Sequence, residues 1–158
     1  MPHSRVRGSA PSALSALSLA LLILVPCASL AAQTIAVSGD PGPLTVGTAT
    51  PGAPLDPASD ASTTYTVTTT APGQKIVARL DAPMPAGVTL SILLTAPGGA
   101  ASAGEVVLST IDQTVVGSIP TPDSYAGLTI TYRLKASTSA GSIPTTAGSV
   151  VLTVVPGP

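Results

Sequence analysis

The sequence predicts an all-β protein, a single immunoglobulin-like antiparallel β-sandwich of about seven to nine strands. Three observations predict it. Short runs rich in Val, Thr, Ile and Leu recur along residues 34–155, and turns rich in Gly and Pro separate them. Within several runs apolar and polar residues alternate one by one, which is the period of a half-buried strand. After residue 33, the residues do not follow the repeat of an amphipathic helix.

The first 31 residues are predicted to be a secretory signal peptide. Arg5 and Arg7 precede an apolar run, Ala16–Val25, and small residues follow it up to an expected cleavage after Ala31. A positive, an apolar and a small-residue region in this order are typical of such peptides. The apolar run is about half of the roughly 20 residues that a membrane-spanning helix needs. We therefore expect an exported β-sandwich domain of residues 32–158, without an integral membrane segment.

Cleavage would also remove the chain's one cysteine and one histidine. Cys27 invites a comparison with lipid-anchored proteins, but Pro26 stands where their motif has a small residue, so an ordinary signal peptide is favoured. The remaining chain has four basic and seven acidic side chains, a net charge of −3, with no basic cluster. This balance argues against binding to nucleic acid.

The clearest pattern lies in residues 62–81, "STTYTVTTTAPGQKIVARLD". Pro72 and Gly73 suit the centre of a type II turn, and a hairpin closed there would pair Tyr65 with Leu80. This register sorts the side chains by face. The predicted core face holds Tyr65, Val67, Thr69, Ile76, Ala78 and Leu80. The predicted outer face holds Thr64, Thr66, Thr68, Thr70, Lys75, Val77, Arg79 and Asp81.

The other strands follow from the same reasoning. In chain order the predicted strands are residues 34–38, 44–48, 63–70, 75–81, 88–95, 105–109, 113–116, 128–136 and 149–155. Residues 88–95 and 128–136 alternate, so each is expected to have one buried face. The last strand is apolar on both faces, which indicates either a central or covered strand or one that waits for a partner. The covered position is favoured.

No catalytic, cofactor-binding or metal-ligating residue is predicted, and the chain is not expected to be an enzyme. A Ser or Thr nucleophile needs a base, usually His, and zinc or copper sites need His or Cys. The expected mature chain has neither residue. Lys75 and Lys135 fall on predicted outer faces, where a lysine stays charged and solvated rather than acting as a base.

Carboxylates leave weaker alternatives open. Asp56 and Asp60 could share a calcium ion, since calcium takes several oxygen ligands, although Asp beside Pro and Ser is common in ordinary turns. Glu105 with one Asp could form a glycosidase pair, but aromatic residues, which line sugar sites, are scarce, with three Tyr and no Trp or Phe. A small-ligand or calcium-binding secreted module is therefore the alternative function.

Two segments, "GLTITYRLKAS" and "AGSIPTTAGSVVLTVV", together with the signal peptide and the Thr-rich strands, resemble bacterial exported surface β-sandwich proteins. The resemblance is to the spore coat protein U and fimbrial-subunit kind. It implies a structural or adhesive protein that is secreted, periplasmic or on the cell surface. It also implies self-association, or association with another surface protein, through an edge strand. Residues 34–38 are then the expected donor strand for a neighbour.

Overall fold

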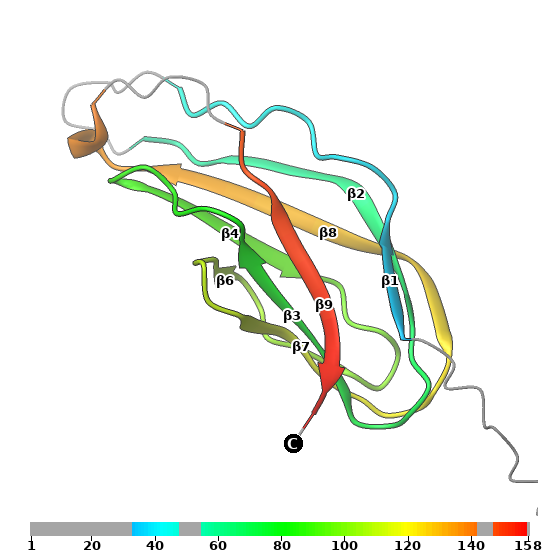
Figure 1. Cartoon of the computed structure of the whole chain (residues 1–158). Helices are drawn as coiled ribbons and strands as arrows, with labels where there is room; N and C mark the ends of the chain where they lie inside the picture. Colours follow the sequence, from blue (N-terminus) through cyan, green and yellow to red (C-terminus); the bar gives the residue numbers. More distant parts are fainter. Residues whose placement is uncertain (1–32, 48–54, 142–146, 158) are drawn as a thin grey trace, which may run out of the picture. The chain divides into compact units, whose positions relative to one another are not determined.

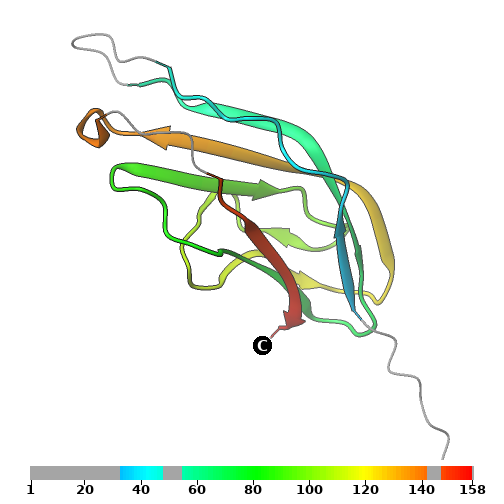
Figure 2. The same ribbon diagram turned by 45° about the horizontal axis from the view of Figure 1, so that its top comes forward.

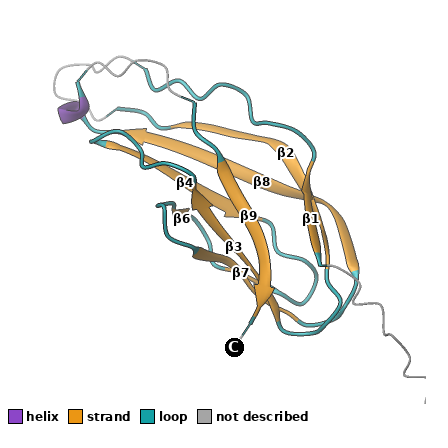
Figure 3. Ribbon diagram, in the orientation of Figure 1, coloured by secondary structure: helices purple, strands orange, loops and turns teal. Residues whose placement is uncertain are grey.

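The computed structural model describes residues 33–47, 55–141 and 147–157, so the predicted signal peptide lies outside the described residues. These residues form two antiparallel sheets that pack face to face, which confirms the predicted β-sandwich (Figures 1 and 3). The five-stranded sheet has the order β1 (Thr34–Val37), β2 (Ala58–Thr68), β8 (Ser124–Ala136), β4 (Val88–Leu94) and β6 (Val106–Val107). The four-stranded sheet has the order β5 (Ala101–Ser102), β7 (Gln113–Ile119), β3 (Gln74–Leu80) and β9 (Val150–Pro156). A short 3₁₀ turn, Thr138–Ala140, follows β8.

The core lies between the two sheets and contains predicted residues together with Leu108, Val115, Val116 and Ile119, which were not predicted for it. All six members of the predicted core face in residues 62–81 are buried. Ile92 and Leu94 of β4 and Ile130 of β8 join them, as the alternation predicted. The Tyr65 hydroxyl donates a 2.6 Å hydrogen bond to the Thr95 carbonyl, so the one polar group of this buried ring has a partner. Aliphatic side chains therefore fill most of this core, together with the rings of Tyr65 and Tyr132.

The predicted pairing of the first hairpin is wrong, although its faces are right. β2 pairs with β1 and β8, whereas β3 pairs with β7 and β9 in the other sheet. Gly73 has the positive φ, 75°, that the predicted turn needs, but its N–H donates to the Ile119 carbonyl. The turn carries the chain from one sheet to the other (Figure 2). Alternation shows which side chains face the core, and strands of two opposed sheets face the same core.

Three smaller predictions also fail. Residues 44–47 form no strand, because Pro41 and Pro43 interrupt backbone pairing just before them; Thr48 lies outside the described residues. Leu44 nevertheless packs against the core. The strand predicted at residues 105–109 shrinks to Val106–Val107, and β5 was not predicted. Val77, which was predicted on the outer face, is only 6% exposed.

Among the strands that the structure describes, none pairs with the far side of the last strand or covers it. β9 ends the four-stranded sheet, and its side chains inside the strand are half-buried except for exposed Thr153. This edge position fits the less favoured alternative, and a partner strand for β9 stays a prediction.

Candidate functional site

The free edge of β9 is the first candidate site. β9 pairs with β3 over its whole length, from Val150 opposite Leu80 to Pro156 opposite Gln74. No described strand pairs with its other side. β1, the edge strand of the opposite sheet, contacts β9 but shares no ladder with it (Figures 1 and 2). β9 therefore presents a row of unpaired backbone groups.

The hydrogen bonds at the two ends of β9 identify these groups. Asp81 N donates to Ser149 O at 3.1 Å, and Gly157 N donates to Gly73 O at 2.8 Å. In an antiparallel ladder, alternate residues point their N–H and C=O groups toward the same neighbour. The odd-numbered residues of β9 therefore bond to β3. Val150, Leu152 and Val154 point their backbone groups away from β3, and their side chains pack against the core.

Apart from Pro156 at its last position, neither the length nor the composition of β9 protects this edge. The strand has seven residues, "VVLTVVP", with no charged side chain. Charged side chains, bulges and very short strands are the usual protection of sheet edges. The edge strands β5 and β6 have two residues each, and β1 has four. β9 is therefore the edge in the described part of the chain that is best suited to accept another strand.

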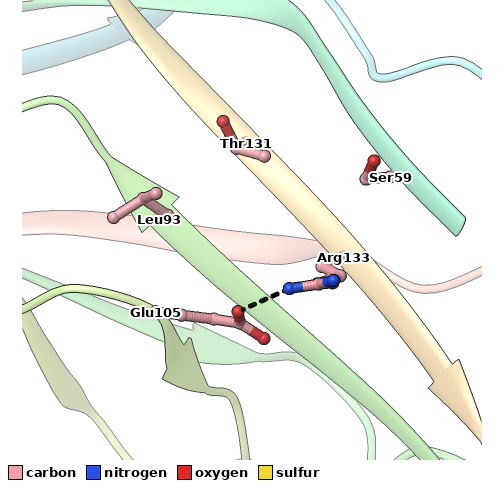
Figure 4. Close-up of a pocket in the computed structure, with 5 residues that line it drawn as sticks. All are labelled: Ser59, Leu93, Glu105, Thr131 and Arg133. Atoms are coloured by element: carbon pink, nitrogen blue, oxygen red, sulfur yellow. Dashed lines mark hydrogen bonds and ion pairs between the residues drawn. The ribbon is translucent and has the colours of Figure 1, made fainter. Parts of the chain in front are cut away.

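Glu105 forms the second candidate, a polar cluster on the outer face of the five-stranded sheet. Its Oε1 accepts hydrogen bonds from Ser91 Oγ at 2.6 Å and from Lys135 Nζ at 2.9 Å. Its Oε2 lies 3.2 Å from an Arg133 guanidinium nitrogen (Figure 4). The ladder between β4 and β8 places Ser91 opposite Arg133 and Thr89 opposite Lys135. Ser91 is only 2% exposed because the Glu105 segment lies over it.

A shallow hollow adjoins this cluster. It has a volume of about 160 Å³ and is lined by Ser59, Leu93, Glu105, Thr131 and Arg133 (Figure 4). Sites for small molecules usually enclose about 300–1,000 Å³. The Arg133 side chain points toward Glu105, which it shares with Lys135, so this cluster carries one net positive charge. The hollow can hold water or accept one side chain of a partner.

The hydrogen bond from Ser91, followed by that from Lys135, lowers the pKa of Glu105 from 4.5 to about 2. Glu105 is therefore a carboxylate at neutral pH, whereas the acid of a glycosidase pair needs a raised pKa. Lys135 is half exposed, and its Nζ forms an ion pair with the Glu105 carboxylate at 2.9 Å. The cluster can thus join strands and present charge.

The aspartates of the calcium alternative lie just before and within β2. Asp60 Oδ1 accepts bonds from Ser62 N at 3.0 Å and Ser62 Oγ at 2.8 Å, and these bonds lower the pKa of Asp60. Both residues lie inside β2, at the register shift between Asp60 and Thr63, so these bonds are local to an irregular part of the strand. Asp56 is exposed. Among residues 33–47, 55–141 and 147–157, no three His, Cys, Asp or Glu side chains form a group that could hold a metal ion.

Replacing Glu105 with glutamine is expected to lower the thermal unfolding midpoint at pH 7 and to change it little at pH 2. The pKa of Glu105 is lower in the folded chain than its ordinary value. Its ionised form therefore stabilises the fold above about pH 4.5, and this contribution is lost as the pH falls toward 2. Calorimetry at both pH values measures the effect.

The matched control for this measurement is Asp112→Asn. It removes one exposed ion pair, in which Arg79 Nε and Asp112 Oδ1 are 3.5 Å apart, and such pairs contribute little. A Glu105→Gln variant that loses no more stability than Asp112→Asn at pH 7 would contradict the structural role of Glu105.

Comparison of the chain with protein-family models, with curated proteins and with solved structures gave no match. Among the described residues, no helix is long and apolar enough to cross a membrane.

Proposed function

We propose that this chain is an exported, non-enzymatic structural or adhesive protein of a bacterial surface, and that it assembles through the free edge of β9. The observation that carries the proposal is this seven-residue, uncharged edge. Proteins generally protect such an edge, because it is a template for pairing with another chain. An edge left open over three outward-pointing residues is therefore best explained by a partner strand.

The N-terminal sequence and the resemblance to exported surface proteins support the location and the structural role. The chemistry of Glu105 supports the same conclusion, because its carboxylate is engaged by a serine, a lysine and an arginine. Residues 34–38, the expected donor strand, pair in this chain with its own β2 through Thr34–Val37. Donation to a neighbour would require this pairing to open.

The Val154→Pro variant tests the role of the edge. Proline has no N–H and is tolerated at sheet edges when its nitrogen points away from the neighbouring strand. Val154 points its N–H away from β3, so this variant should keep the fold and lose a bonding group of the free edge. We expect the exported wild-type protein to associate in size-exclusion chromatography with light scattering. Val154→Pro should remain monomeric, with an unchanged far-UV circular dichroism spectrum.

Two outcomes would contradict the proposal. One is equal association by the wild type and by Val154→Pro, which would remove β9 from the assembly. The other is a protein that stays in the cytoplasm of its bacterial host with an uncleaved N-terminus. Cleavage is expected within about two residues of Ala31.

A further inference from the structure

We infer that the partner at the β9 edge is β9 of a second copy of this chain, paired antiparallel about a two-fold axis at Leu152. This inference rests on the proposed role of the edge and names its occupant. The two four-stranded sheets would then join into one sheet of eight strands across the dimer.

The direction of the free groups supports self-pairing. In a ladder centred on Leu152, Val150 lies opposite Val154 of the second copy, and Leu152 lies opposite its own equivalent. Each residue that points its backbone groups outward thus meets another such residue. The two strands then exchange about six hydrogen bonds and leave none of these groups unpaired. β9 carries no charge that would be repelled by its copy.

Pro156 favours the register centred on Leu152 over the two registers that are shifted by two residues. Like Val154, Pro156 has an even number, so its nitrogen points toward the free edge. The ladder with β3 therefore loses no hydrogen bond at this proline. A register shifted by two residues in one direction would place Pro156 opposite Val150, where the ring occupies the position of a donor. The opposite shift would leave Val154 outside the pairing. In the register centred on Leu152, Pro156 lies beyond the three paired residues.

Self-pairing also requires less rearrangement than donation of the N-terminal strand. Four residues of β1 pair with β2, and Ile35 packs against the core. Transfer of β1 to a neighbour would break these contacts, whereas β9 can pair without leaving β3. A two-fold contact uses the same surface on both copies and therefore closes at two chains. The inference predicts a dimer and not an open chain of subunits.

Cysteine cross-linking tests the register directly, in a full-length Cys27→Ser background. Val151 and Thr153 alternate with the outward-bonding residues, so their side chains lie on the outer face of the sheet. In the predicted dimer, Val151 faces Thr153 of the second copy at a Cα distance of about 4.5 Å, which a disulfide can bridge. Val151 and its own equivalent are separated by about 8 Å, which is too far for a disulfide.

We expect Val151→Cys and Thr153→Cys to form a covalent dimer when they are mixed and mildly oxidised, and neither to do so alone. The yield should reach up to about half of the chains, the share in mixed dimers. Adding Val154→Pro to both should reduce the yield severalfold. Circular dichroism of each single-cysteine variant confirms that it is folded.

Every other outcome overturns the inference. Cross-linking of Val151→Cys alone or of Thr153→Cys alone would show a register shifted by two residues. Failure of the mixture to cross-link would show that β1 or another segment occludes the edge, or that a different chain occupies it. If the mixture fails while Val154→Pro still abolishes association, the proposed function survives with a different partner. If Val154→Pro has no effect on association, the proposed function fails as well.

Discussion

Replacing Ile76 with alanine is expected to lower the free energy of unfolding by about 2–5 kcal/mol. Ile76 lies in the middle of β3 and is fully buried in the cluster between the two sheets. Truncation removes apolar contacts and leaves a cavity, which the strands on either side of β3 prevent from closing completely. Urea denaturation followed by circular dichroism measures the change through the transition midpoint.

Ile111→Ala makes the same chemical change outside the core. Ile111 is 71% exposed in the loop before β7, so we expect its effect to stay within about ±0.5 kcal/mol. The difference between the two variants reports burial, because the change in composition is identical. Equal stabilities would contradict the packing of β3 against the opposite sheet.

The faces of the strands could be predicted from the sequence, but most of their partners could not. A two-residue period sends Tyr65 and Val67 to the core whichever strand lies beside them. The same period is satisfied by a hairpin and by two strands in opposite sheets, as β2 and β3 show. Gly73 predicts a turn and not the sheet to which the turn leads. Long-range pairing, such as β2 with β8, has no local sequence signal.

The two candidate sites depend to different degrees on the strand pairing, which the sequence does not predict. Glu105 meets Ser91, Arg133 and Lys135 across sequence separations of 14, 28 and 30 residues. Each residue was visible in the sequence, but the ladder between β4 and β8 is needed to place the two cations beside the carboxylate. β9 had a local signal, apolar residues on both faces. That signal fits a central strand as well as an edge, and only the topology distinguishes them.

Replacing Val155 with proline is expected to lower the free energy of unfolding by about 2–4 kcal/mol, because it removes a ladder bond and leaves a carbonyl of β3 unpaired. Val155 lies opposite Lys75, at a position whose N–H points toward β3. The proline ring would also push the two strands apart. Thermal and urea denaturation of the monomer, at low protein concentration, measure the loss.

Val154→Pro is the matched variant one residue earlier. It makes the same substitution in the same strand, so the intrinsic preferences of valine and proline for a strand cancel in the comparison. Its N–H points to the free edge, and we expect a loss of about 1 kcal/mol from the half-buried side chain alone. Pro156, two residues further on, already occupies a position of this kind.

The ordering of the two variants reports the direction of the β9 backbone, independently of any partner. A larger loss for Val155→Pro means that odd-numbered residues bond to β3 and that even-numbered residues face outward. The reverse ordering would move the free groups to Val151, Thr153 and Val155. In a ladder centred on Leu152, Val151 and Thr153 would then be a hydrogen-bonded pair about 5.5 Å apart, and Leu152 would point its backbone groups away from the second copy, so the proposed set of paired residues would be wrong. The stability of two monomeric variants thus tests the premise on which the dimer depends.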